Sequence, residues 1–503
     1  MTGHAASESS ALLGVEVDID GSEIIDELPI ISRTNTFPVT SPSYGASIDV
    51  IKHHDYEDHP RSEAEERAEQ LLEPEPVLSE ELRKSLALIY PVVITYTLEY
   101  SPGLFTNISA LSIGFGLTSA LDTLCSQAYG ANKLMNIGIY LQSAIIVVGS
   151  CLIPIFLLNW HSGLFLSYLG QDPEVAQLAG EFSRYTIFGV PFLFVYEMCR
   201  KVLQAQNIVR PMLLFAIIGN CVNIFGGYYL TYLTPMGFHG AALSRTIGYV
   251  VLPLCMIPYF IISRNYRQWW PGWNLRQAYA RVPLFLRLGL PALAMMAMEW
   301  WAYELLAVMA GNLPDGVVAV STHSVLMNVA ATVYTVYTGI SVSGNIRVGN
   351  CLGANHPKKA RLISRLTMGM VFALSFFFSA LILFFRHEIP KIVINDPAAI
   401  QYAATALIIM GPYQFIDALN CVMQGIYRGA GWQNRAAQIN IWAFYGFGLP
   451  IGALLSFYFN VGVIGLWIGF GSGHLLSFTI CSLRLYYSSW EEMALEAQAR
   501  VAH

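Results

Sequence analysis

The stretch Pro291-Ala292-Leu293-Ala294-Met295-Met296-Ala297-Met298-Glu299-Trp300-Trp301-Ala302-Tyr303-Glu304-Leu305-Leu306 decides the class of this protein. It reads as a membrane-spanning helix, yet the carboxylates of Glu299 and Glu304 lie inside it. On insertion scales, a charged side chain at the centre of a bilayer costs about 2.5–3.5 kcal/mol. Helix packing alone does not require that cost twice in one span. The pair therefore favours an ion or proton pathway, and hydrogen bonding between neighbouring helices is the structural alternative.

The whole chain has the composition of an integral membrane protein. Of its 503 residues, 54% are hydrophobic and 12% are charged, and the mean hydropathy is +0.48. Soluble domains carry about 25% charged residues. The sequence contains no P-loop, so we expect no hydrolysis of ATP and no enzymatic activity. The eight cysteines form no Cys-x-x-Cys pair, so we expect no disulfide framework, metal or cofactor.

Charge is segregated along the chain. Residues 1–82 hold 19 acidic and 4 basic side chains, a net charge of −15, whereas residues 83–503 carry a net charge of +9. An acidic segment rich in Ser and Pro cannot bury enough apolar surface to offset the entropy lost on ordering, so we expect a disordered tail. We therefore predict a cytosolic tail at 1–82, an N-terminal transmembrane lobe at 83–263, an inter-lobe linker at 264–282, a C-terminal transmembrane lobe at 283–488 and a second cytosolic tail at 489–503.

Membrane spans are predicted wherever about 20 mostly apolar residues follow one another. We predict one or two spans within 86–121 and ten more, at 134–158, 182–206, 211–233, 240–263, 284–310, 316–342, 364–386, 401–426, 437–459 and 461–486. Loops rich in Lys and Arg alternate with loops that hold few, and the rich side is predicted to be cytosolic. Both termini then lie in the cytosol. The membrane is expected to be the plasma membrane or that of a vacuole or lysosome.

The sequence repeats itself with an offset of 220–225 residues. Gly130-Ala131-Asn132, for example, recurs as Gly353-Ala354-Asn355. Two parallel halves of this kind are typical of transporters that bind their substrate between the halves. The acids of the two halves correspond as Glu99 with Glu299 and Glu197 with Asp417.

One part of the repeat is shorter in the first half. Gly130 follows Pro91 by 39 residues, whereas Gly353 follows the equivalent Pro291 by 62, a difference of 23 residues. At 1.5 Å per residue this is roughly 34 Å, about one membrane crossing. Residues 86–121 would then form two short spans or one long helix. This difference leaves open that the chain is a non-transporting isoform.

Four motifs carry a resemblance to a known family. Ser119-Ala120-Leu121-Asp122-Thr123-Leu124-Cys125-Ser126-Gln127-Ala128-Tyr129-Gly130, Glu299-Trp300-Trp301-Ala302-Tyr303-Glu304, Arg347-Val348-Gly349-Asn350 and the segment 424–433 resemble, in order, signatures of the multidrug and toxic compound extrusion (MATE) transporters of eukaryotic type. The resemblance covers about 83–488. It implies an all-α membrane fold of twelve helices in two six-helix lobes with a cleft between them, the first lobe here being short.

The resemblance also implies proton- or sodium-driven antiport of organic, often cationic, compounds. Glu299 and Glu304 match the acids of the family's seventh helix, and Asp417 matches the acid of its tenth. Asn328 stands where some animal members carry a further acid. We expect Tyr303 to line the substrate site, and Glu99 and Glu197 are secondary candidates in the first lobe.

Other features of the residues refine this set. Glu299 and Glu304 are five positions apart and so point about 140° from each other on a helix, which argues against a shared proton. Asp417 lies on a polar stripe of its own helix. Asp122 is expected to anchor a loop or helix end, and His323 to be a satisfied interior residue.

We therefore predict a secondary antiporter that exports organic, cationic compounds or xenobiotics in exchange for protons. Protons are favoured over sodium because buried carboxyl groups take up protons more readily than exposed ones. The expected partners are small organic molecules, protons and the lipid bilayer, with no nucleic acid, and the chain is expected to be a monomer. A lipid or metabolite flippase of the same fold and an inactive isoform are the alternatives.

Overall fold

The computed structural model describes residues 78, 80–85, 106–168, 173–314 and 316–502. Throughout these residues the regular secondary structure is helical. They all belong to one compact unit, Ala68–His503. Glu99, the short part of the repeat before Thr106 and nearly all of the predicted N-terminal tail lie outside the described residues, so their predictions stay predictions.

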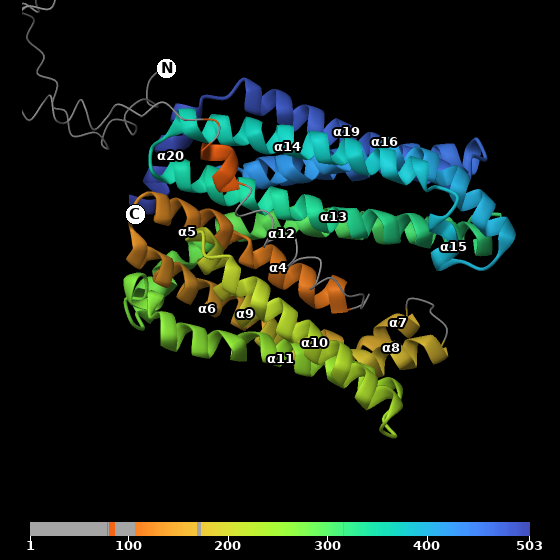
Figure 1. The fold of residues 1–503 in the computed structure, drawn as a ribbon, viewed down its shortest axis with the longest axis horizontal. Helices are drawn as coiled ribbons and strands as arrows, with labels where there is room; N and C mark the ends of the chain where they lie inside the picture. The colour runs from red at the N-terminus through yellow and green to blue at the C-terminus, as the bar shows by residue number, and fades with distance from the viewer. Residues whose placement is uncertain (1–77, 79, 86–105, 169–172, 315, 503) are drawn as a thin grey trace, which may run out of the picture. The chain divides into compact units, whose positions relative to one another are not determined.

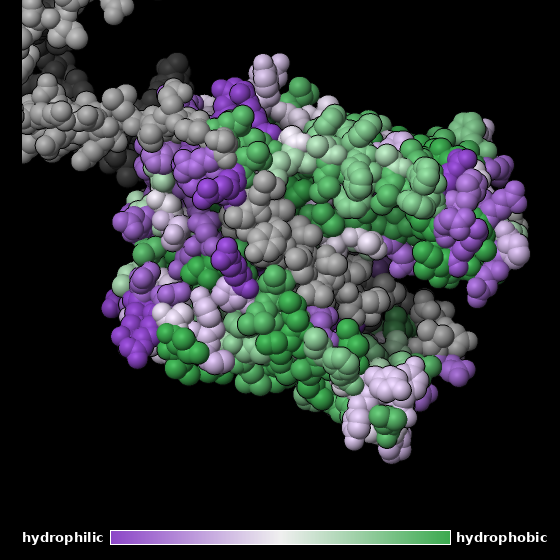
Figure 2. Space-filling view, viewed as in Figure 1, coloured by the Kyte–Doolittle hydropathy of each residue, from purple (hydrophilic) through white to green (hydrophobic). Residues whose placement is uncertain are grey.

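Among the described residues, nine helices are long and apolar enough to cross a membrane. They are α6 (Leu134–Trp160), α10 (Arg210–Tyr232), α11 (Phe238–Ser263), α12 (Leu275–Gly311), α13 (Gly316–Gly353), α14 (Pro357–Phe384), α16 (Pro397–Ala430), the helix Gln433–Tyr458 and α19 (Val463–Tyr486). Each coincides with one of the ten predicted spans. Figure 2 shows hydrophobic side chains along the helix walls and hydrophilic ones gathered toward the two helix ends. This is the surface expected of a protein that lies in a bilayer.

The predicted span 182–206 is broken in the structure. It consists of α8 (Pro173–Thr186) and α9 (Val190–Ala205), separated at 187–189. Pro191 lies in the first turn of α9, where a proline is tolerated because the first backbone N–H groups of a helix have no partner within it. A continuous helix would instead lose the hydrogen bond from residue 191 and meet a clash with the proline ring.

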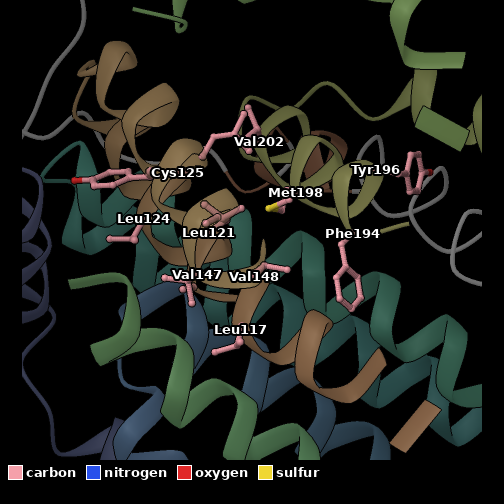
Figure 3. Packing of buried hydrophobic residues seen from close by; sticks show 14 of the residues in the cluster. Leu117, Leu121, Leu124, Cys125, Val147, Val148, Phe194, Tyr196, Met198 and Val202 are labelled. Carbon is pink, nitrogen blue, oxygen red and sulfur yellow. The ribbon is translucent and has the colours of Figure 1, made fainter. Parts of the chain in front are cut away.

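The described part of the first repeat begins with three helical segments that follow one another. These are the π-helical turn η1 (Asn107–Leu111), α4 (Ser112–Thr118) and α5 (Ala120–Gly130), and Figure 1 shows α4 and α5 end to end. Leu117, Leu121 and Phe194 belong to a buried cluster that joins these segments to α6 and α9 (Figure 3). Residues 106–130 therefore form a packed element of the first lobe.

The second lobe is built around α16. This helix packs against α13, α14 and α19. Of its most apolar 18-residue segment, 72% of the residues are buried, compared with 17–56% for the same segment of the other spanning helices. A polar residue in the middle of α16 is thus shielded from lipid. The neighbouring helix α12 begins at Leu275, inside the predicted linker, where the Asn274 side chain accepts a hydrogen bond of 3.1 Å from the Gln277 N–H.

The two lobes meet through equivalent helices of the repeat, α5 and α13. A Cβ atom on Gly130 would overlap the backbone of Asn350, and a Cβ atom on Gly353 would overlap the backbone of Gln127. Gly130 and Gly353 are repeat equivalents, and Gln127 and Asn350 are related by the same offset of 223. The contact is therefore reciprocal, as expected of two halves related by a pseudo-twofold axis.

Candidate functional site

Three helices of the second lobe bring ionisable side chains together. Glu299 comes from α12, Asp417 from α16 and His474 from α19. One oxygen or nitrogen atom from each side chain lies within 4.8 Å of the other two. The structure thus joins Glu299 and Asp417, two residues expected at the site, and adds a histidine. We call these three residues the acid–histidine cluster.

Asp417 is the most enclosed acid of the cluster. Its exposed fraction is 1%, and Gln414, Cys421 and Gln424 on the same stripe of α16 are also buried. Within the described part of the chain, neither carboxylate oxygen of Asp417 accepts a hydrogen bond. A buried polar atom without a partner is rare and calls for a functional explanation. Glu299, by contrast, is partly exposed.

His474 is fully buried and faces Asp417. Its Nδ1 atom lies 3.1 Å from the carbonyl oxygen of Phe470, and its Nε2 atom lies 3.5 Å from Oδ1 of Asp417. The rings of Phe470 and Phe444 pack against the imidazole, with centroids 4.5 and 4.7 Å away. His474 was not among the residues expected at the site from the sequence. The available signal was an ionisable residue inside a predicted span, which by itself suggests function.

A pair of tyrosines adjoins the cluster. The hydroxyl oxygens of Tyr303 on α12 and Tyr413 on α16 are 2.5 Å apart. The Tyr413 ring also packs edge-on against His474, with centroids 5.5 Å apart. Tyr303 was expected at the site, whereas Tyr413 was not identified from the sequence. The Tyr445 hydroxyl donates to the Met298 carbonyl at 3.1 Å and holds α12 beside the helix Gln433–Tyr458.

Two other predicted residues lie outside the acid–histidine cluster. Glu304 is half-buried and is not among the three residues whose polar atoms converge. Asn328 on α13 is exposed, and its Nδ2 atom donates to the Ser324 carbonyl of the same helix at 2.8 Å. The structure therefore does not join either residue to Glu299 and Asp417.

The first-lobe acid Glu197 has charged neighbours. It forms ion pairs with Arg200 at 2.5 Å and with Lys201 at 3.6 Å, and Lys201 also pairs with Asp122 at 2.8 Å. All four side chains are buried. Two acids and two bases balance within this group, and they tie α5 to α9. Asp122, expected to anchor a loop or helix end, pairs with Lys201 of the neighbouring helix α9.

One end of the lobe interface is closed by hydrogen bonds. Gln127 of α5 donates to the Gly429 carbonyl at 3.0 Å. The C-terminal helix α20 (Trp490–Ala502) lies over this junction at the left of Figure 1. Its Arg500 donates to Gln127 Oε1 at 3.1 Å and to the Ala430 carbonyl at 3.0 Å. A single side chain of α20 therefore bridges the two lobes.

Comparisons with known proteins agree with this architecture. The family model MatE matches residues 103–229 and 291–454. The chain is 32% identical to Protein DETOXIFICATION 16 of Arabidopsis thaliana over 400 residues, which cover 79% of this chain and 82% of the relative. It is 34% identical to human Multidrug and toxin extrusion protein 1 over 365 residues, covering 72% of this chain and 63% of the relative. The crystal structure of the eukaryotic MATE transporter AtDTX14 superposes with a TM-score of 0.80 at 26% identity, covering 84% of this chain and 99% of that one.

Proposed function

The chain belongs to the MATE family of transporters, and from this premise we propose that it exports organic cations in exchange for protons. The observation that carries the proposal is the proximity of Glu299 and Asp417 inside two spanning helices. Two carboxylates this close repel each other when both are charged, so one of them tends to hold a proton. A cationic substrate relieves the same repulsion. Proton and substrate would therefore compete for one site, which is what antiport requires.

The residues around the acids support protons over sodium as the coupling ion. His474 places a nitrogen atom in the cluster, and imidazole nitrogen suits transition metals and protons better than hard cations, which prefer oxygen ligands. The hydroxyls of Tyr303 and Tyr413 also adjoin the acids, but they are already paired with each other. The cluster thus resembles a proton-binding site more than an oxygen cage.

The aromatic residues beside the acids support an organic cation as the substrate. The faces of Tyr and Trp rings attract cations within about 6 Å. Tyr303 adjoins the cluster, and Trp301 is exposed on the same helix. We propose that Glu304 and Asn328 contribute to the substrate path rather than to the proton site, because both are accessible and lie outside the cluster.

The closed lobe junction suggests how access alternates. We propose that the end carrying α20 faces the cytosol, in accord with the positive-inside rule, and that the lobes rock apart there when the transporter turns inward. Opening would break the hydrogen bonds of Gln127 and Arg500. The chain would act as a monomer in the plasma membrane or in a vacuolar or lysosomal membrane.

The test is transport by the purified full chain in proteoliposomes with an imposed pH gradient and a fluorescent organic cation. We expect Glu299→Gln to abolish uptake driven by the gradient. Glu388→Gln is the matched control, since Glu388 is an exposed acid paired with Lys391 away from the cluster. Gradient-driven uptake at the wild-type rate in Glu299→Gln would overturn the proposal.

A further inference from the structure

We propose that His474 is the positioning residue that holds the coupling proton on Asp417; this rests on the proposed exchange of protons for substrate. Neither the family comparison nor the sequence pattern singled out this histidine. It lies on α19, whereas the two acids lie on α12 and α16.

The tautomer of His474 follows from its backbone contact. The Phe470 carbonyl can only accept, so the imidazole nitrogen 3.1 Å from it, Nδ1, must carry a hydrogen. In a neutral ring the other nitrogen, Nε2, then presents a lone pair. That lone pair faces Oδ1 of Asp417 at 3.5 Å. An ionised carboxylate would oppose one acceptor with another.

A single proton resolves this conflict. If the proton is on Asp417, the carboxyl group donates a hydrogen bond to Nε2 of His474. If the proton is on His474, an imidazolium lies beside a carboxylate. In both arrangements the pair is neutral overall, whereas without the proton it carries one negative charge next to Glu299. A net charge is costly where the surroundings are buried, so the protonated pair is favoured. His474 therefore raises the affinity of this site for a proton.

The surroundings hold the ring in position for this task. Phe444 and Phe470 pack on the imidazole, and Tyr413 meets it edge-on. The separation of 3.5 Å is slightly longer than a hydrogen bond, and contacts of this kind commonly tighten in the working complex. Within the described residues, the titratable and charged groups near the pair and Glu299 come from three helices: Glu299 and Tyr303 on α12, Tyr334 and Tyr337 on α13, and Tyr413, Cys421 and Arg428 on α16. His323 on α13 contacts Trp467 rather than the pair.

Release of the proton completes the cycle. When a cationic substrate approaches Glu299, its positive charge disfavours the proton on the neighbouring pair. The proton leaves to water in the transport path, and Asp417 becomes an anion that can bind the substrate. His474 remains neutral at the start and at the end of this exchange, so only one proton moves.

The experiment measures the affinity of the full chain in detergent for a fluorescent organic cation as a function of pH. In the wild type, affinity should rise with pH as the pair loses its proton. We expect His474→Phe, which keeps the aromatic packing but removes the acceptor, to shift this rise by about one pH unit toward acid. That shift corresponds to a tenfold loss of proton affinity, the size expected for one lost hydrogen bond.

Infrared difference spectroscopy supplies a second readout. A carbonyl stretch of a protonated carboxyl group that disappears in Asp417→Asn is assigned to Asp417. In His474→Phe it should vanish at a lower pH than in the wild type. His323→Phe is the matched control, because His323 is also a buried histidine of the same lobe but lies outside the cluster. Its pH profile should be that of the wild type.

The outcomes separate this inference from the proposed function. If His474→Phe keeps the wild-type pH profile while Glu299→Gln abolishes coupling, the role of His474 is wrong and proton exchange stands. If Glu299→Gln transports normally, the proposed exchange of protons for substrate is wrong, and the role of His474, which rests on it, is wrong as well. Should His474→Phe not fold, His474→Gln replaces it, with a shift in the same direction, because the amide can donate to the ionised carboxylate.

Discussion

Gly130 packs directly on the backbone of Asn350, and the absence of a side chain on Gly130 is what permits the two helices to touch. The reciprocal contact of Gly353 with Gln127 doubles this interface. Small residues are typical of close helix packing in membranes, where the lipid is as apolar as the side chains and contact must come from shape. The closed end of the lobe interface therefore depends on two glycines.

Gly130→Ala should loosen this end. The added methyl group meets backbone rather than a flexible side chain, so the helices must separate, at a cost of about 1–3 kcal/mol. Thermal unfolding of the purified protein should show the loss. Labelling of Cys351, which is buried beside the contact, by a thiol reagent should accelerate. Gly149→Ala is the control, since a Cβ atom there meets nothing within 4 Å. If both variants unfold at the same temperature, the contact between Gly130 and Asn350 has room for a methyl group.

Removing the positive charge of Lys201 should destabilise the first lobe. Lys201→Met leaves Asp122 and Glu197 with one base between them in a buried setting, which typically costs about 3–5 kcal/mol. The double variant Lys201→Met with Asp122→Asn restores the balance and should recover part of the loss in melting temperature. If the changes in melting temperature caused by the two substitutions are additive in the double variant, Lys201 and Asp122 do not act as a pair.

Arg500→Ala should weaken the bridge made by α20. Arg500 donates to both lobes, and hydrogen bonds from a charged group contribute about 1.5–3 kcal/mol each. We expect faster proteolysis of the C-terminal helix and a larger share of molecules open at this end. Distances between labels placed on α5 and α16 would report the opening. Arg484→Ala, at an exposed position, should leave both measurements unchanged.

Asp417→Asn should flatten the pH dependence of substrate binding. In the wild type, a cation binds more tightly as pH rises, because the deprotonated carboxylate attracts it. An amide neither exchanges a proton nor carries charge, so the variant should bind weakly at every pH. Titration of a fluorescent cation at a series of pH values measures this. A variant whose affinity still rises with pH would assign the titration to another group, such as Glu299.

The sequence by itself determined the features that depend on local composition. Of the ten spans predicted after residue 130, nine appear as continuous helices in the described residues, because hydropathy over about 20 residues reports directly on the bilayer. The repeat predicted the equivalence of Gly130 and Gly353. The acids inside Pro291–Leu306 and on α16 pointed to a functional site in the second lobe, because a charge inside a membrane span is costly whatever the helix packs against.

Only the tertiary structure decided which of these side chains meet. His474, Asp417 and Glu299 lie on three helices that are far apart in sequence, and their convergence depends on which face each helix turns to the lobe interior. The same packing left Glu304 and Asn328 outside the cluster and surrounded Glu197 with bases. Close packing against helices that are far away in sequence determines which side of each helix points inward. The spacing of residues along one helix therefore shows that a residue can point inward, but not which residues it meets there.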